Sequence, residues 1–262
     1  MKVRLLCTIV LLALLPFAAE AHDLLPQEVR TYIEENPDAT AEDIRSFAEL
    51  NELPVSGAGS VLSVASEKRS FLKNTIAFVR LGIEHILSGP DHVLFIVAMT
   101  LSVMEFSAVL RMSVAFTVAH SITFILAGTS LLTLSSLFVE PIIALSIAVV
   151  AGLGLVQKRF ENVPSRKIGW VSIATVFMFG LFHGLGFAGL LRDIRVPEES
   201  FLWSLVSFNI GIELGQLLVL AVALPVLMLA RRSPWAKEAH IVLAVAIIFI
   251  GCVWTIERLR LL

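Results

Sequence analysis

The chain has 262 residues, of which 57% are hydrophobic and 16% are charged, and its formal net charge is −2. A soluble domain would carry about 25% charged residues, so this composition excludes an ordinary soluble protein. With a mean hydropathy of +0.87, it predicts an all-α polytopic membrane protein in a lipid bilayer. The net charge lacks the positive excess that is typical of nucleic-acid-binding proteins, so we expect no nucleic-acid partner.

Residues 1–21 have the pattern of a secretory signal peptide. Lys2 and Arg4 give a positive start, an apolar stretch covers residues 5–17, and Ala19-Glu20-Ala21 forms a small-x-small cleavage site. Cleavage at this site leaves the mature N-terminus on the extracytoplasmic side. An uncleaved anchor is the alternative, and it gives the same topology.

Residues 22–70 form a short polar segment that we expect to be extracytoplasmic. We predict a helix over 27–35, and a second helix to Leu50 that opens with the capping-box pattern Thr40-Ala41-Glu42-Asp43. A Gly/Ser/Ala-rich linker follows at 54–66. About 50 residues contain too little core for a strong independent domain. We therefore predict a helical hairpin that rests on the membrane or on a partner.

Residues 71–262 form the predicted transmembrane domain. A helix needs about 20 apolar residues to span a bilayer. Apolar segments that span or nearly span occur at 74–104, 110–129, 137–156, 168–191, 201–230 and 239–257. The first is interrupted by Ser88-Gly89-Pro90-Asp91, where glycine and proline weaken a helix.

The basic loops predict how many times the chain crosses the membrane. The loop at 158–167 is the most basic, and a second basic cluster lies at 231–237. Positively charged loops stay in the cytoplasm. With an exported N-terminus, both clusters are cytoplasmic only if 74–104 crosses once. We therefore expect about six transmembrane helices, the first of them broken at residues 88–91, and extracytoplasmic termini.

Four ionisable residues gather around that break: Glu84, His85, Asp91 and His92. Ionisable groups cost a few kcal/mol each in hydrocarbon, so they usually have a function there. Imidazole and carboxylate are ligands for borderline divalent metals such as nickel, cobalt or zinc. The bend brings His85, Asp91 and His92 toward one point, which favours a metal or proton site. The alternative is that Asp91 caps the second half of the helix while the others are solvated at the interface.

Two further histidines lie inside later spans. His120 lies in Ala119-His120-Ser121-Ile122-Thr123, and His183 lies beside Gly180 and Gly184, whose GxxxG spacing lets helices approach closely. A buried histidine can also serve only as a hydrogen-bonding group. We count both as candidate metal ligands.

A polar stripe marks the fifth span. Asn209, Glu213 and Gln216 lie at i, i+4 and i+7 of an apolar helix. We expect Glu213 to meet a cation, a metal or a proton, with Asn209 and Gln216 in support. Glu140 opens the third span, where a carboxylate also suits a helix start. Cationic side chains are nearly absent from the depth of these groups, which favours cation binding.

The motifs together resemble those of the HupE/UreJ family of membrane proteins, which are associated with nickel enzymes. The resemblance covers about residues 75–220. It is carried by His85-x5-Asp91-His92 in the broken span, Ala119-His120-Ser121, Phe182-His183-Gly184 and Phe208-Asn209-x3-Glu213-x2-Gln216.

The resemblance implies a permease for nickel or cobalt in the bacterial inner membrane. His85, Asp91 and His92 would be the first ligands, with His183 and Glu213 completing that site or relaying the ion. The metal is then the cargo, no cofactor is permanently bound, and the protein is not an enzyme. Metalloenzyme maturation proteins are the expected protein partners, and a homo-oligomer is left open.

Two other functions compete with a permease. A non-transporting accessory factor for metalloenzyme maturation would use the exported segment 22–70 to bind metal or a partner. An intramembrane metalloenzyme would need three or four ligands and an open position to activate water. The sequence shows no obvious nucleophile or substrate pocket for such chemistry.

Overall fold

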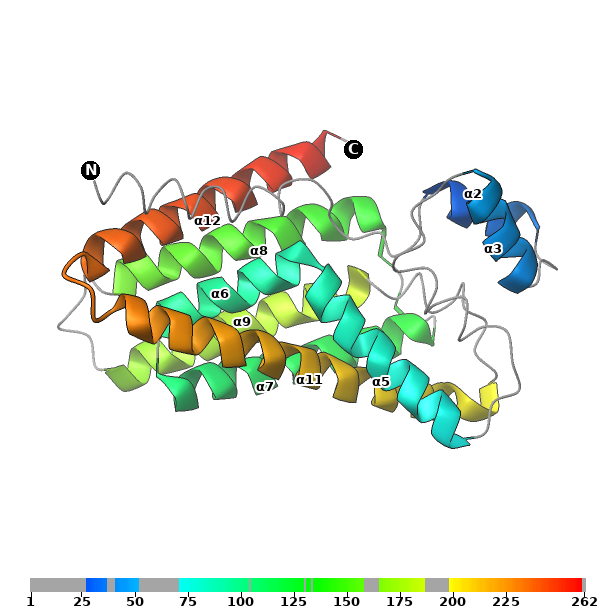
Figure 1. Ribbon diagram of the computed structural model, residues 1–262, viewed down its shortest axis with the longest axis horizontal. Helices are drawn as coiled ribbons and strands as arrows, with labels where there is room; N and C mark the ends of the chain where they lie inside the picture. The colour runs from blue at the N-terminus through cyan, green and yellow to red at the C-terminus, as the bar shows by residue number, and fades with distance from the viewer. Residues whose placement is uncertain are drawn as a thin grey trace.

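The computed structural model describes residues 27–36, 41–51, 71–103, 105–129, 131–132, 134–157, 165–186 and 198–260. The predicted signal peptide, the linker at 54–66 and most of the basic loop at 158–167 lie outside these residues. Every regular element in the described ranges is an α-helix (Figure 1). The predicted all-α polytopic class is confirmed.

The two helices expected in the N-terminal segment are α2 (Gln27–Glu35) and α3 (Ala41–Leu50). Both are amphipathic, and they bury Val29, Ile44 and Ala48. The ring of Tyr32 stacks on the ring of Phe47 with 4.1 Å between centroids. A core of this size is small, as expected for so short a segment.

The first span is broken where the sequence predicts. Helix α5 (Phe71–Ser88) ends before Gly89, α6 (Pro90–Val103) begins directly after it, and the two helices are bent by 72°. Proline has no N–H to continue the α5 ladder, but it suits the first position of a new helix. The Gly89 N–H still donates to the His85 carbonyl at 3.1 Å, so α5 closes its last turn normally.

The remaining helices of the domain are α7 (Phe106–Gly128), α8 (Ser136–Gln157), α9 (Ser165–Gly186), α11 (Glu198–Ala230) and α12 (Ala236–Leu259). Of these, α7, α8, α11 and α12 are long and apolar enough to cross a membrane, and the bent pair α5–α6 makes a fifth candidate span. Helix α9 contributes a shorter apolar stretch, Trp170–Gly186, at the position of the remaining expected crossing.

Helix α6 lies in the middle of the bundle (Figure 1) and contacts α5, α7, α8, α11 and α12. Around it, α5 packs on α11, α7 on α9, and α12 on α8. Because α6 begins with Pro90, Asp91 and His92, this arrangement places the break inside the protein. Irregular backbone at membrane depth is tolerated when protein surrounds it.

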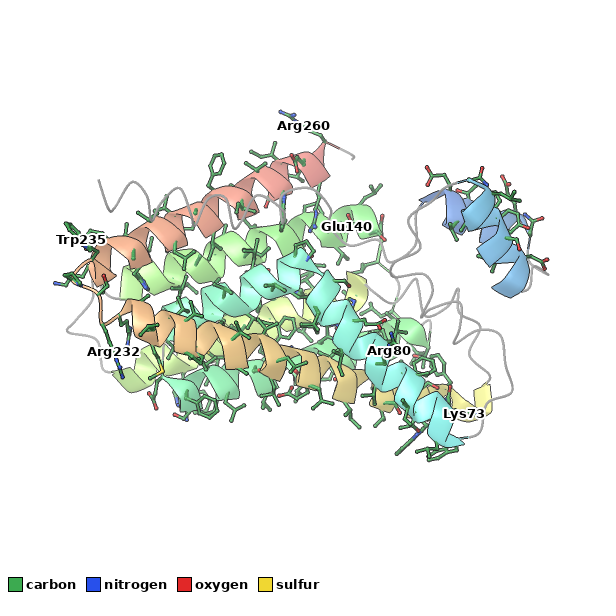
Figure 2. All side chains as sticks on the ribbon, viewed as in Figure 1. Lys73, Arg80, Glu140, Arg232, Trp235 and Arg260 are labelled. Carbon is green, nitrogen blue, oxygen red and sulfur yellow. The ribbon has the colours of Figure 1, made fainter. Side chains whose placement is uncertain are left out.

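The outer surface suits a lipid environment. Large apolar side chains are exposed along the sides of the helices, including Val118, Leu145, Val222 and Phe249. Among the side chains labelled in Figure 2, Lys73 lies near the start of α5, Arg260 at the end of α12 and Arg232 in the turn between α11 and α12.

Candidate metal centre

The break forms a cluster of three buried histidines. His85 comes from the last turn of α5, His92 from the first turn of α6, and His120 from the middle of α7. Each is at most 3% exposed, so the site lies inside the protein. One nitrogen from each ring lies within 4.8 Å of the other two, a spacing at which they could hold one metal ion. We call these residues the three-histidine group.

The bend accounts for the meeting of His85 and His92. In a straight helix, residues seven apart are separated by about 10.5 Å along the axis. Here the two ring centroids are 4.5 Å apart. Glycine is needed at the bend because a Cβ on residue 89 would lie 2.6 Å from Nδ1 of His92 and 3.0 Å from the His85 carbonyl oxygen.

His183 borders the three-histidine group without belonging to it. Its ring centroid lies 5.4 Å from that of His92. Its Nδ1 lies 2.9 Å from the Phe179 carbonyl oxygen. A carbonyl only accepts, so Nδ1 is the donor and Nε2 carries the lone pair of the ring, as is common for metal-binding histidines. His183 is therefore placed as a candidate fourth ligand.

Close packing of α9 on α7 brings His183 to this position. A Cβ on Gly184 would collide with the His120 carbonyl oxygen and the Thr123 hydroxyl, and one on Gly180 would collide with the backbone of Phe116. The GxxxG pattern therefore works as the sequence indicates: it allows the α9 backbone to lie directly against the helix that carries His120.

Asp91 lies beside the three-histidine group, between His92 and a cation. It is fully buried. Its Oδ1 accepts a hydrogen bond from the His92 backbone N–H at 2.8 Å and lies 3.1 Å from the His92 Nδ1. Its Oδ2 lies 3.7 Å from Nη2 of Arg258. Asp91 thus stabilises the N-terminal turn of α6, as a carboxylate does near a helix start, and it can orient His92.

Arg258 is a member of the site that the sequence analysis missed. It is 6% exposed, near the end of α12. Its Nη1 donates to the Glu140 carbonyl oxygen at 3.0 Å, and its guanidinium carbon lies 5.9 Å from the Trp254 ring centroid. Arg258 is therefore an exception to the expectation that cations are nearly absent at this depth. The sequence signal that could have indicated this arginine is its spacing of four residues from Trp254, which places both side chains on one face of a helix.

The polar stripe of α11 faces α7 and lies outside the three-histidine group. Ser121 donates to Asn209 at 2.7 Å, Thr117 donates to Glu213 at 2.7 Å, and Ser113 donates to Gln216. We call these three pairs the α7–α11 ladder. Ser121 follows His120 directly in the sequence, so the α7–α11 ladder begins next to the three-histidine group. Nothing in the sequence marks Ser113 or Thr117 as partners of this stripe.

Glu84 and Glu140 do not contribute a carboxylate to the three-histidine group. The Glu84 carboxylate pairs with Arg80 at 2.6 Å on the outer side of α5, where the Arg80 side chain is 75% exposed. Glu140 contacts the site only through its backbone carbonyl, which accepts from Arg258. The structure therefore places these two predicted supporting residues at the edge of the site.

The arrangement can bind a divalent transition metal. Neutral imidazole nitrogens suit zinc, copper, iron and nickel, and the Asp91–Arg258 pair adds no net charge to the site. These features define the class: an all-α polytopic membrane protein with a buried histidine cluster at a broken helix.

The comparison with protein families agrees with this class. A family model described as HupE / UreJ protein matches residues 62–258, so the chain belongs to the HupE/UreJ family. Helices α2 and α3 precede the matched region. Neither the curated proteins nor the solved structures gave a match.

Proposed function

We propose that the protein is a membrane permease for a divalent transition metal, with nickel as the first choice and cobalt as the second. The observation that carries this proposal is the three-histidine group, which lies buried at the break between α5 and α6. Transporters often build substrate sites at such breaks. Membership of the HupE/UreJ family supports the choice of metal.

In the proposed path, the ion enters from the extracytoplasmic side of the bacterial inner membrane. It exchanges bound water for the imidazole nitrogens of His85, His92 and His120, and His183 is the next ligand within reach. The α7–α11 ladder then offers oxygen atoms from Ser121 toward Ser113. Under the expected topology, this direction leads toward the cytoplasmic start of α7. The predicted role of Glu213 is to take part in this later stage.

Uptake of radioactive nickel tests the proposal. Cells that express the wild type should take up nickel, with cobalt as the strongest competitor among cobalt, zinc and copper. His92→Ala removes one of three ligands and should lower uptake at least tenfold. His240→Ala is the matched control, because His240 is a buried histidine near the start of α12 and outside the three-histidine group. It should retain at least half of the uptake.

Two outcomes would contradict the proposal, the first a permease of any kind and the second the role of the three-histidine group in transport. One is the absence of uptake above background for any of these metals, with the protein confirmed in the membrane. The other is equal uptake by the wild type and His92→Ala at equal protein levels.

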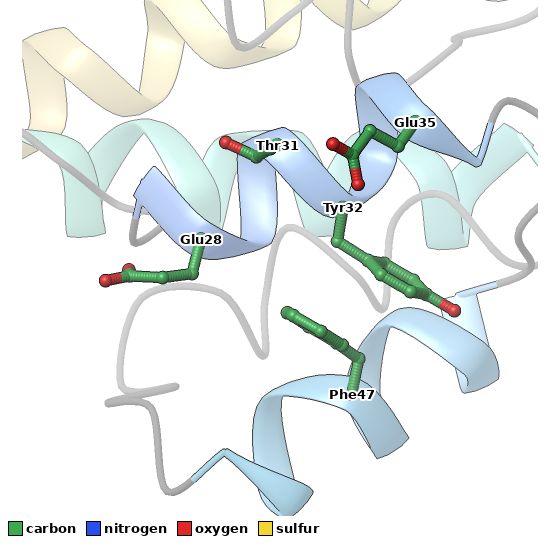
Figure 3. Close-up of a pocket in the computed structure, with 5 residues that line it drawn as sticks. All are labelled: Glu28, Thr31, Tyr32, Glu35 and Phe47. Atoms are coloured by element: carbon green, nitrogen blue, oxygen red, sulfur yellow. The ribbon is translucent and has the colours of Figure 1, made fainter.

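One observation favours an accessory factor as the second candidate. Helices α2 and α3 precede the family match and form an open surface pocket of about 380 Å³, lined by Glu28, Thr31, Tyr32, Glu35 and Phe47 (Figure 3). A maturation protein could dock on a helical segment of this kind, which lies outside the family domain.

Deletion of residues 22–70, with the signal peptide retained, separates the two candidates. A permease should keep most of its nickel uptake, because the three-histidine group lies entirely in 85–120. An accessory factor should lose its effect on the activity of the nickel enzyme in the same cells. Immunoblotting of membranes confirms equal amounts of both chains.

A further inference from the structure

The buried carboxylate of Asp91 lies next to both the candidate metal site and a buried cation. The Oδ1 atom of Asp91 lies 3.1 Å from a ring nitrogen of His92, and its Oδ2 atom lies 3.7 Å from the Arg258 guanidinium. Both side chains of the Asp91–Arg258 pair are at most 7% exposed. Water therefore does little to screen either charge.

Arg258 is held in place by groups other than Asp91. It donates to the Glu140 carbonyl oxygen on α8 at 3.0 Å and lies near the Trp254 ring on its own helix. These contacts would remain if the carboxylate moved. The pair thus joins a fixed cation on α12 to an acid on α6, one residue from His92.

A divalent ion in the three-histidine group would change the balance of charge around Asp91. Without it, the Asp91–Arg258 pair carries no net charge. With it, Arg258 and the ion are two cations on either side of one carboxylate. At an effective dielectric constant of about 20, charges a few ångströms apart alter a binding constant by more than tenfold.

We infer that Arg258 is an internal competitor for the transported metal ion: it holds Asp91 when the site is empty of metal and weakens metal binding so that the ion can leave. When the ion binds, Asp91 turns toward it and away from Arg258. When the ion departs, Arg258 takes Asp91 back. This inference rests on the proposed permease function, in which a site must bind strongly enough to load and weakly enough to release.

Removal of the Arg258 charge should raise the affinity for Ni²⁺, although it also removes the buried contact with Asp91. Purified Arg258→Gln should bind Ni²⁺ at least about tenfold more tightly than the wild type, as measured by calorimetric titration in detergent. Arg258→Lys keeps the charge and should stay within about threefold of the wild type. Arg260→Gln is the matched control, because Arg260 is exposed two residues further on, and it should be unchanged.

A positioning role for Arg258 predicts the opposite result. If the arginine only holds Asp91 and His92 in place, Arg258→Gln should bind Ni²⁺ with equal or lower affinity, and that outcome overturns the inference. An equal gain in Arg258→Gln and Arg258→Lys also overturns it, because the charge would then not be the cause.

A second comparison covers the case in which Arg258→Gln does not fold because the buried Asp91 carboxylate has lost its cation. In Asp91→Asn, Arg258 remains a cation beside the site but keeps its contacts with the Glu140 carbonyl and the Trp254 ring. Asp91→Asn/Arg258→Gln removes both charges together. The double variant should bind Ni²⁺ at least about tenfold more tightly than Asp91→Asn. Equal affinities would show that the charge of Arg258 does not oppose metal binding, which overturns the inference.

The wild type separates the failure of this inference from the failure of the proposed function. Wild-type protein that binds none of Ni²⁺, Co²⁺ and Zn²⁺ contradicts the metal site itself. Wild-type protein that binds Ni²⁺, together with no gain on removal of Arg258, contradicts only the competition between arginine and metal.

Discussion

At the scale of single residues, Gly89 determines how closely the His92 ring can approach the last turn of α5. It separates two helices that each contribute a histidine, and it leaves room for the His92 ring, since a Cβ there would lie 2.6 Å from Nδ1 of that ring. Proline at position 90 ends the α5 ladder, but only the small residue before it lets the ring approach the last turn of α5.

We expect Gly89→Ala to damage the site more than the fold. The new methyl group can be accommodated by a shift of the His92 ring, so the free energy of unfolding should fall by only about 1–2 kcal/mol. The same shift moves one nitrogen out of the three-histidine group, and Ni²⁺ affinity should fall at least tenfold. Calorimetric titration and thermal unfolding in detergent measure the two effects.

Ser88→Ala is the control for this prediction, because Ser88 is the exposed neighbour of Gly89. It should leave nickel affinity within about twofold of the wild type. Unchanged affinity in Gly89→Ala would mean that the position of the His92 ring does not determine metal binding.

Residues of the site differ in how well the sequence predicts them. His85 and His92 are close in sequence to a Gly-Pro break, so local rules suffice to bring them together. Arg258 is far from Asp91 in sequence and two residues before an exposed arginine, and such a residue looks interfacial. Glu84 was expected to support the site, but Arg80 lies four residues before it, and this spacing favours a pair on the helix surface.

At the scale of helices, glycine contacts decide which helices can carry site residues close together. Gly82 of α5 and Gly211 of α11 face each other, and a Cβ on either would meet the Cα of the other at 2.9 Å. Gly215 continues this contact one turn further, against Ile86. The α5–α11 contact lies next to His85, so its spacing determines the position of that ring.

We expect Gly211→Leu to force α5 away from α11. The larger side chain would collide with the Val79 carbonyl oxygen and with Gly82, and overpacking of this kind costs about 1–3 kcal/mol or more. Because His85 moves with α5, nickel binding should also weaken. The midpoint of thermal unfolding in detergent and Ni²⁺ titration provide the measurements.

Gly152→Leu on α8 is the matched control, since a Cβ at Gly152 meets no atom within 4 Å. It should leave both properties close to those of the wild type, because leucine is a better helix former than glycine. Equal behaviour of the two variants would argue against a tight α5–α11 contact.

The α7–α11 ladder shows where helix-level prediction ends. The stripe of Asn209, Glu213 and Gln216 was visible as a polar face, but its partners were not. Ser113 and Thr117 are hydroxyl residues in an apolar helix, where a serine or threonine commonly bonds its own backbone. Which helix supplies a partner depends on packing between distant segments, and the sequence does not show it.

At the scale of the whole molecule, the class was predictable because hydrocarbon imposes one strong rule. Backbone groups in a membrane must be paired within the protein, so long apolar segments become helices. The bounds of α7, α8 and α12 therefore differ from the predicted segments by only a few residues. The order of helices around α6 was not predictable, because all their outer faces are similarly apolar.

The shortness of α6 has an electrical consequence. The stretch from His92 to Val103 rises roughly 17 Å, about half of a hydrocarbon core of about 30 Å. If Val103 lies at one face of the core, an ion at the three-histidine group sits near mid-depth. A divalent ion that reaches it has then moved about one elementary charge through the field, worth about 2.3 kcal/mol per 100 mV. Loading of the proposed site from outside would thus depend on membrane voltage, with occupancy rising as the cell interior becomes more negative.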